Sequence, residues 1–429
     1  MTERQYKDSG IDWIGEIPNR WKTTRIKFIG ETKSGDEIRK ESILDHGEYP
    51  VYGGGKKIGF CNDYNANSND ILIGRVGSCG KINLPKQKAW ATDNAIILRT
   101  KSNFNYQFLA YCLKCVPLEI MITQTAQPLL TATSILNCNV PRIALQEQQQ
   151  IADFLDSKTA SINSAIQAQK DIIEKLKEYK KAVITEAVTK GLNRDGEMKK
   201  IDFLWIHEFP KNWGIYKLNH LLDYNHPYPL GDGDHGSIKA KDYATCGIPL
   251  LRVQNLGYAE SINTDNLVYI SKAQNETIKN STLHPDDILF AKTGATIGKT
   301  AILTDDTPIA NTTSHVGKIT VNKKKFFPRY VYYFLSSEIG IFQLWDIAGK
   351  KATRPEVGLD EVKYIKFLIP NSIAEQKAIA DYLDAQCNRI TNAIFRCNDI
   401  IEKLEEYKKS IIYNAVTGKI DCRKDVIPE

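Results

Sequence analysis

The feature that most constrains this chain is a long segment that occurs twice. The string IADFLD begins at Ile151, and IADYLD begins at Ile379, a displacement of 228 residues. The same displacement relates IIEKLKEYKKAVITEAVTKG, from Ile172, to IIEKLEEYKKSIIYNAVTGK, from Ile400. The chain therefore contains an internal repeat, and any fold that it adopts must use one element twice.

Each copy of the repeated segment predicts a long helix. Residues 147–190 contain no proline and are rich in Gln, Lys, Glu, Ala and Ile, and the apolar residues recur at helical steps. A helix of roughly 44 residues extends about 66 Å, which suits a spacer. We expect the two copies to pair antiparallel as a coiled coil; the alternative is that each packs only on its own domain as a core helix. The residues predicted to pack the pair are Ile151, Leu155, Ile162, Ile166, Ile173, Leu176, Ile379, Leu383, Ile390, Ile394, Ile401 and Leu404.

Weaker repeats precede the helical segments. WIGEIPNRW begins at Trp13 and WIHEFPKNW begins at Trp205, while NDILIGRVGSCGK, ending at Lys81, resembles DDILFAKTGATIGK, ending at Lys299. The bodies between these motifs differ in length and sequence, whereas the helical segments hardly differ. This contrast predicts one shared task for the helices and a separate task for each body.

Short strand-like runs separated by turn residues predict mainly β bodies. These runs are VYGGG, DILIGRVG and NAIILRT in the first body, and IPLLRVQNL, DILFAKTG and HVGKITV in the second. FNYQFLAYCLKC and FFPRYVYYFLSS have helical spacing, and their aromatic residues are expected in the core. The predicted fold class is α+β: two mainly β domains separated by two long antiparallel helices, related by a pseudo-twofold internal repeat. The expected segments are 1–146, a first domain; 147–191, a first spacer helix; 192–373, a second domain; 374–420, a second spacer helix; and 421–429, a tail.

Composition excludes several classes of protein. The chain has 429 residues and a net charge of +6, and it contains no apolar run long enough to span a membrane. Its start lacks the pattern of a signal peptide, and its nine scattered cysteines are typical of reduced thiols. We therefore expect a cytoplasmic protein without a membrane partner. The basic excess lies in residues 1–200 and would face phosphates if folding gathers it on one side; a solvated surface is the alternative.

Polar residues interleaved with glycine at predicted loop tips are candidates for binding DNA; the alternative for each segment is an ordinary surface loop. Arg and Lys can bond the acceptor edge of guanine, Asn and Gln can bond adenine, and glycine allows a close approach to phosphate. The candidates are Tyr52, Lys56, Lys57, Arg75, Ser78 and Lys81 in the first body, and Arg252, Gln254, Asn255, Lys292, Thr293, Thr296, Lys299, Lys350, Lys351, Thr353 and Arg354 in the second.

Signals of catalysis are incomplete. TGATIGKT, from Thr293, lacks the first glycine of a phosphate-binding loop at the required spacing. The glycine pattern that begins at Gly231 is flanked by acidic residues that would repel a pyrophosphate. Cys112 and Cys115 form a single CxxC without a second pair at ligand spacing. The sequence therefore predicts no catalytic residues and no metal site.

Together, the duplicated motifs resemble the specificity subunit of type I restriction-modification enzymes over nearly the whole chain. The resemblance rests on the two Trp motifs, on GEYPVYGGG, GIPLLRVQNL and DILFAKTGATIGK, and on Glu147 with Gln148 before IADFLD and Glu375 with Gln376 before IADYLD. It implies two target recognition domains, each reading one half of a split, asymmetric site in double-stranded DNA, held apart by two conserved helices.

The resemblance also implies partners and cofactors. Two methyltransferase subunits would assemble on the chain and use S-adenosylmethionine to methylate adenine, and restriction subunits would cleave DNA with ATP and Mg. The chain itself would bind no cofactor and perform no catalysis. Two alternatives stay open at this point: the chain is itself a DNA adenine methyltransferase, or it is a structural coiled-coil adaptor that never contacts bases.

Overall fold

The chain folds into two compact units, which are described separately. The computed structural model describes residues 5–122, 129–193, 195–203, 206–233, 237–260, 262–304, 309–349 and 355–422. Unit 1 comprises Met1–Lys170 and Asn398–Glu429, and unit 2 comprises Asp171–Cys397. Among the described residues, none of the helices combines the length and the apolar character that crossing a bilayer requires.

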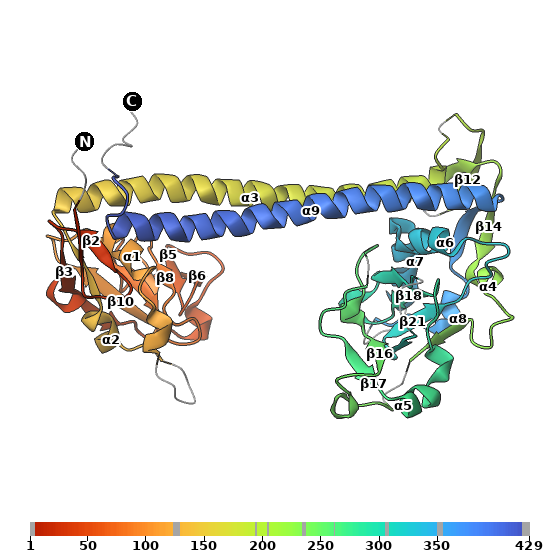
Figure 1. Ribbon diagram of the computed structural model, residues 1–429, viewed down its shortest axis with the longest axis horizontal. Coiled ribbons are helices and arrows are strands. Elements are labelled where there is room, and N and C mark those ends of the chain that lie inside the picture. Colours follow the sequence, from red (N-terminus) through yellow and green to blue (C-terminus); the bar gives the residue numbers. More distant parts are fainter. Residues whose placement is uncertain are drawn as a thin grey trace. The chain divides into compact units, whose positions relative to one another are not determined.

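Two long helices contribute to both units. Helix α3 spans Leu145–Lys190 and helix α9 spans Ile373–Val416. In unit 1 the first part of α3 lies beside the last part of α9, where Lys408 Nζ donates a hydrogen bond to Asn163 Oδ1 at 2.6 Å (Figure 1). The two helices are therefore antiparallel there.

The apolar stripe of each helix packs on the opposite helix and on a body at the same time. In unit 1, Leu155 and Ile166 share a core cluster with Ile411 and with Phe108 of the body. The same arrangement occurs in unit 2, where Val183 of α3 clusters with Leu383 of α9 and with residues of its body. Of the predicted packing residues, Leu176, Ile394, Ile401 and Leu404 are half-buried and the other eight are buried: Ile151, Leu155, Ile162, Ile166, Ile173, Ile379, Leu383 and Ile390.

The body of unit 1 is built from small sheets with helices on the outside. Its sheet orders are β4-β10-β7-β8, β6-β5-β9, β11-β3 and β1-β2. The elements are β1 Tyr6–Asp8, β2 Glu16–Pro18, β3 Lys22–Arg25, β4 Gly30–Ser34, β5 Tyr49–Tyr52, β6 Lys57–Cys61, β7 Ile71–Gly74, β8 Ile82–Asn83, β9 Trp90–Ala91, β10 Ala95–Thr100, α1 Tyr106–Leu113, α2 Ala132–Asn137 and β11 Asn139–Arg142.

The body of unit 2 repeats these sheets in the same order. Its orders are β15-β21-β18-β19, β17-β16-β20, β14-β22 and β12-β13. The elements are β12 Met198–Phe203, β13 Ile206–Pro210, β14 Trp213–Lys217, α4 Leu218–Leu221, β15 Leu230–Asp232, β16 Ile248–Leu251, β17 Val268–Ile270, α5 Lys272–Thr277, β18 Ile288–Ala291, β19 Thr300–Ile302, β20 Asn311–Thr312, β21 Val316–Ile319, α6 Pro328–Ser336, α7 Glu338–Gly349, α8 Leu359–Val362 and β22 Lys366–Pro370.

The repeat extends to individual strand pairs and confirms the predicted fold class. In each body one short strand runs parallel to its neighbour: β5 to β9 in unit 1 and β16 to β20 in unit 2. The other strand pairs are antiparallel. The predicted strand-like runs contain β7, β10, β16, β18 and β21, and VYGGG overlaps only the last two residues of β5. Two bodies with different sequences thus share one topology.

Buried glutamines explain why both helices start with the same EQ motif. Gln148 Oε1 accepts a hydrogen bond from the backbone N of Asn105 at 2.8 Å, just before α1. Its equivalent, Gln376, accepts from the backbone N of Phe327 at 2.7 Å, just before α6. Both side chains are 1% exposed. Each glutamine therefore joins the start of a long helix to the first turn of a body helix.

The aromatic residues of α1 and α6 lie in the core, as predicted. Phe108, Tyr330 and Phe334 have no exposed surface, and Tyr111 and Tyr333 are almost fully buried. Buried aromatic rings contribute much of the apolar area that stabilises a body of this size. These rings are therefore not available to stack on nucleic-acid bases.

Candidate nucleic-acid interface

Three segments of unit 1 meet at one end of its central sheet. They are the turn after β5 (residues 53–56), the loop after β7 (residues 75–81) and the turn before β10 (residues 92–94). Backbone hydrogen bonds join them: Arg75 N donates to Asn94 O at 2.9 Å, and Thr92 N donates to Tyr52 O at 2.9 Å. We name this group of segments loop cluster 1.

Glycine allows these segments to touch backbone to backbone. A Cβ atom at Gly74 would lie 1.8 Å from Gly54 O, and one at Gly54 would lie 2.5 Å from Val76 O. Both distances are shorter than any real contact of a side chain, so only glycine fits at these two positions. The middle glycine of the GGG string, Gly54, therefore allows two loops of the body to contact each other through their backbones.

Loop cluster 1 brings most of the predicted residues of the first body together. Lys56, Ser78 and Lys81 are exposed, and Tyr52 and Arg75 are half-buried. Lys57 is placed differently, because it lies on β6 with its ammonium group 4.0 Å from the centroid of the Phe60 ring.

Asn94 belongs to loop cluster 1 and was missed by the sequence analysis. It is exposed, and its carbonyl oxygen accepts the hydrogen bond from Arg75 N. An asparagine amide can bond adenine through two hydrogen bonds. The only signal in the sequence was its place as the first residue of the NAIILRT run, directly before β10, which equals the place of His315 before β21.

Unit 2 has an equivalent group of segments, which we name loop cluster 2. It consists of residues 292–299 after β18, residues 313–315 before β21, and residues 355–357. The backbone pattern is the same as in unit 1: Lys292 N donates to His315 O at 2.9 Å, and Val357 N donates to Lys292 O at 2.8 Å. In unit 1, Leu130 N donates to Arg75 O at 3.0 Å in the equivalent place.

Loop cluster 2 presents different side chains. His315 is exposed, and its Nδ1 lies 3.3 Å from Thr293 Oγ1. Thr296 and Lys299 are half-buried, and Thr296 Oγ1 donates to Thr293 O at 2.7 Å. The other candidates of this neighbourhood, Lys350, Lys351, Thr353 and Arg354, lie outside the described residues.

The structure removes Lys292 from the set of side chains available to DNA. Its side chain is 5% exposed and forms an ion pair with Asp232, which is 6% exposed. Glu356 Oε1 lies 3.9 Å from the same ammonium group. A buried, paired lysine loses its partner if it turns outward, which is strongly unfavourable. Sequence reasoning could not foresee this pair, because Asp232 comes from a distant strand.

Asn255 is another predicted DNA-binding residue whose side chain is not exposed. This residue has no exposed surface. Its Oδ1 accepts from the backbone N of Arg252 at 2.9 Å and its Nδ2 donates to Asn263 O at 2.9 Å, so both ends of the amide hold the loop after β16. Gln254 is exposed, and Arg252 Nη2 donates to Asn266 O at 2.6 Å.

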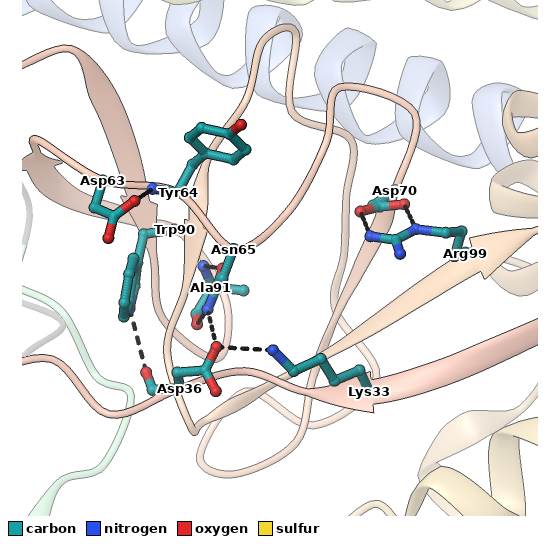
Figure 2. Close-up of polar contacts among 9 residues, drawn as sticks. All are labelled: Lys33, Asp36, Asp63, Tyr64, Asn65, Asp70, Trp90, Ala91 and Arg99. Carbon is teal, nitrogen blue, oxygen red and sulfur yellow. Dashed lines mark hydrogen bonds and ion pairs between the residues drawn. The ribbon is translucent and has the colours of Figure 1, made fainter.

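A polar network supports the long loop between β4 and β5 in unit 1 (Figure 2). Asp36 accepts hydrogen bonds from Asn65 Nδ2 at 2.9 Å and from Lys33 Nζ at 3.1 Å, and its backbone oxygen accepts from Trp90 Nε1 at 3.2 Å. The bonds from Asn65 and then Lys33 lower the pKa of the Asp36 carboxyl. Asp36 therefore joins Lys33 of β4 and Asn65 through its carboxylate, and Trp90 of β9 through its backbone oxygen.

A second contact in Figure 2 fixes the start of β7. Arg99 donates to both oxygens of Asp70, from Nε at 2.9 Å and from Nη2 at 2.8 Å. Asp70 is 1% exposed and also accepts from Asn67 N at 2.8 Å. Its hydrogen bond raises the pKa of Arg99. Such bidentate pairs are rigid, so β7 delivers Arg75 to loop cluster 1 from a fixed base.

Metal binding and reaction of the Cys112 thiol are not supported within the described residues. In that part of the chain, no three His, Cys, Asp or Glu side chains gather in a way that could hold a metal ion. Cys112 is fully buried on α1, and burial raises the pKa of its thiol well above the usual value. A metal ligand or nucleophile requires the thiolate form.

The long helices carry a second repeated surface, which borders their apolar stripe. Tyr179 of unit 2 is 55% exposed and its equivalent in unit 1, Tyr407, is 54% exposed; one helical heptad earlier, Ile172 and Ile400 are 42% and 41% exposed. We name the pair Ile172 and Tyr179 in unit 2, and the equivalent pair Ile400 and Tyr407 in unit 1, the helix-flank surface. It occurs once in each unit.

Cavities accompany the repeated helices in each unit. In unit 2 a cavity of about 430 Å³ is lined by Val183, Glu186 and Tyr382, among others. In unit 1 a cavity of about 250 Å³ is lined by residues at equivalent positions, Ile411, Asn414 and Phe154, and by Tyr407. The two units thus have cavities at equivalent positions of the long helices, each lined by an equivalent aromatic residue, Tyr382 or Phe154.

Comparison with known proteins gives consistent matches. The family described as Type I restriction modification DNA specificity domain matches the chain twice, at residues 18–186 and 210–405. The specificity subunit of the type I restriction enzyme MjaVIII from Methanocaldococcus jannaschii is 26% identical, over 94% of each chain. The EcoBI specificity subunit from Escherichia coli is 26% identical, over 68% of this chain and 61% of its own length.

A solved structure shows the same fold. It is described as "Structural basis underlying complex assembly and conformational transition of the type I R-M system", and it superposes with a TM-score of 0.64. The alignment covers 94% of this chain and 99% of that one, at 12% identity. At this identity the likeness concerns the fold alone.

Proposed function

Because this chain belongs to the family of type I restriction modification DNA specificity domains, with two copies of the domain, we propose that each unit reads one half of a bipartite, asymmetric site in double-stranded DNA. The chain is the noncatalytic specificity subunit of a type I restriction-modification system. The two relatives described above are named specificity subunits, which favours this function over a methyltransferase or a structural adaptor.

One observation carries the proposal: loop clusters 1 and 2 have the same backbone hydrogen bonds and different exposed side chains. Arg75 N and Lys292 N donate to Asn94 O and His315 O, respectively. Base contacts from side chains specify sequence, whereas backbone and phosphate contacts only position the protein. Two equivalent platforms with unlike side chains therefore suit two unlike half-sites.

The residues proposed for DNA contact lie in or beside the two loop clusters, except Arg252 and Gln254, which lie in the loop after β16. They are Tyr52, Lys56, Arg75, Ser78, Lys81 and Asn94 in unit 1, and Arg252, Gln254, Thr296, Lys299 and His315 in unit 2. Lys57, Thr293, Lys350, Lys351, Thr353 and Arg354 stay as predictions from the sequence. The proposed recognition domains are residues 1–146 and 192–373, and the proposed spacer helices are residues 147–191 and 374–420.

The helices are proposed to recruit the partners. A surface that occurs once per unit suits two copies of one protein, and exposed aromatic residues such as Tyr179 and Tyr407 are typical anchors of interfaces. We assign this surface to two methyltransferase subunits, with restriction subunits joining the complex. S-adenosylmethionine, ATP and Mg are expected on those partners and not on this chain, and the complex is expected in the cytoplasm.

Mapping of methylated adenines tests the proposal. The chain is expressed with its neighbouring methyltransferase subunit in a host that lacks both, and the genome is sequenced for N6-methyladenine. We expect methylation within two unlike short sequences at a constant separation. Methylation that does not depend on this chain would contradict the proposal.

A further inference from the structure

Arg75 and Lys292 occupy the same position in the two bodies. Each is the first residue after an equivalent strand, β7 or β18, and each donates its backbone N–H to the residue that precedes the neighbouring strand, β10 or β21. In those sheets Gly74 pairs with Ala95, and Ala291 pairs with Val316. The register therefore makes the two cations structural equivalents.

The surroundings of the two side chains differ. Lys292 Nζ forms its buried ion pair with Asp232 and also lies 3.5 Å from Ser314 O. Arg75 is half-buried, and no side-chain hydrogen bond or ion pair of Arg75 is formed within the described residues. Among the described residues, one cation is neutralised inside its body, and the other forms no such pair.

A single exchange in the neighbouring strand accounts for this difference. Asp232 of β15 pairs with Gly317, the second residue of β21. In unit 1, the residue that pairs with Ile96, the second residue of β10, is Ser34 of β4. Serine therefore stands where unit 2 has the carboxylate, and β4 supplies no acid at this register position.

We infer that Arg75 is a base-reading, specificity-determining residue for the half-site of unit 1, whereas Lys292 is a positioning residue that never contacts DNA. The inference rests on the proposed function and assigns opposite roles to two equivalent residues. A free guanidinium group bonds guanine O6 and N7 with two hydrogen bonds, so the half-site of unit 1 contains a guanine. The Lys292–Asp232 pair instead holds the loop that presents His315.

The test uses the complex of the full chain with its methyltransferase partner and a pool of duplexes randomised over both half-sites. Replacing Arg75 with Ala should relax the preference at one guanine by about tenfold and leave the second half-site unchanged. Replacing Ser34 with Asp should have the same effect, because a carboxylate at that register would neutralise Arg75. The double variant Ser34→Asp, Arg75→Ala should then show no loss beyond that of Arg75→Ala alone.

The matched variant in unit 2 is Lys292→Met combined with Asp232→Asn, which removes both charges together. It should keep the base order of the second half-site within about twofold. Lys292→Met alone should lower the unfolding temperature and the overall affinity without changing which bases are preferred, because it takes the lysine partner away from a buried carboxylate. In every variant, recognition of the half-site assigned to the unmutated unit is the internal control for the folding of the chain.

Two results would overturn the inference: an unchanged preference at every base with Arg75→Ala, or a changed base order with the paired Lys292 and Asp232 variant. A wild-type complex without any sequence preference would instead contradict the proposed function. The two failures are therefore distinguishable in one experiment.

Discussion

Tyr111 donates a hydrogen bond from its hydroxyl to Asp156 Oδ1 at 2.6 Å, which ties the body helix α1 to the long helix α3. The same bond occurs in unit 2, where Tyr333 of α6 donates to Asp384 Oδ1 of α9 at 2.6 Å. Body and helix are thus fixed to one another by equivalent pairs in both units. A body held in this way keeps its loop cluster in a constant orientation relative to its long helix.

Loss of either hydroxyl should destabilise its own unit. Tyr111→Phe and Tyr333→Phe each remove a hydrogen bond to a carboxylate in a largely buried place, and we expect each to cost about 1–3 kcal/mol of unfolding free energy. Urea unfolding of the purified chain measures this. Tyr224→Phe is the matched control, because Tyr224 is 69% exposed. A loss of unfolding free energy no larger than that of the control would argue against a stabilising role for these hydrogen bonds.

The contribution of Tyr111 to the free energy of unfolding should also depend on pH. Burial, and then the hydrogen bond to Asp156, raise the pKa of Tyr111 above the usual 10. The folded chain therefore retains this proton at a pH at which the unfolded chain releases it. The stability difference between wild type and Tyr111→Phe should be constant at lower pH and shrink as the pH rises above 10. Urea unfolding along a pH series checks this; a difference that grows above pH 10 would show the opposite sign.

The helix-flank surface should bind one partner per unit. Tyr179→Ala and Tyr407→Ala each delete an exposed aromatic anchor, so each should weaken the binding of one methyltransferase subunit by at least about fivefold, in line with anchors that cost more than 1 kcal/mol. The double variant should weaken both. Native mass spectrometry of the assembled complex counts the subunits, with Tyr224→Ala as the control. Full assembly of the double variant would place the docking surface elsewhere.

Longer helices should change only the unread gap between half-sites. Seven residues inserted after residue 170 in α3 and seven after residue 397 in α9 add about 10 Å of helix and preserve the apolar stripe. We expect the gap to grow by about three base pairs at 3.4 Å each, with both half-sites unchanged. Methylation mapping reads this directly, and the matched control is a two-residue insertion, which turns the following apolar stripe by about 200° and so breaks it. New bases within either half-site would show that the helices take part in reading.

The fold was predictable where the signal is local. The spacing of Ile151, Leu155 and Ile162 is sufficient for a helix, and α3 and α9 were both expected from it. The order of the sheets was not predictable, because β10 lies between β4 and β7 and each pairing joins distant segments. A single sequence contains no record of these registers.

The candidate site was predictable only in part, for the same reason. The sequence identified Arg75 and Lys81 as loop residues, and folding brings them together with Asn94, which only the turn before β10 supplies. It could not distinguish Arg75 from Lys292, because their difference depends on residues 34 and 232 in partner strands. Burial of a charged side chain is decided by such distant neighbours.

The most direct test of two unlike readers on one repeated scaffold is selection of duplexes from a fully randomised pool by the methyltransferase-bound wild-type chain. We predict that sequencing of the bound fraction recovers two different blocks of constrained bases, separated by a constant number of unconstrained positions. Recovery of a single contiguous block, or of no constrained bases, would contradict the account.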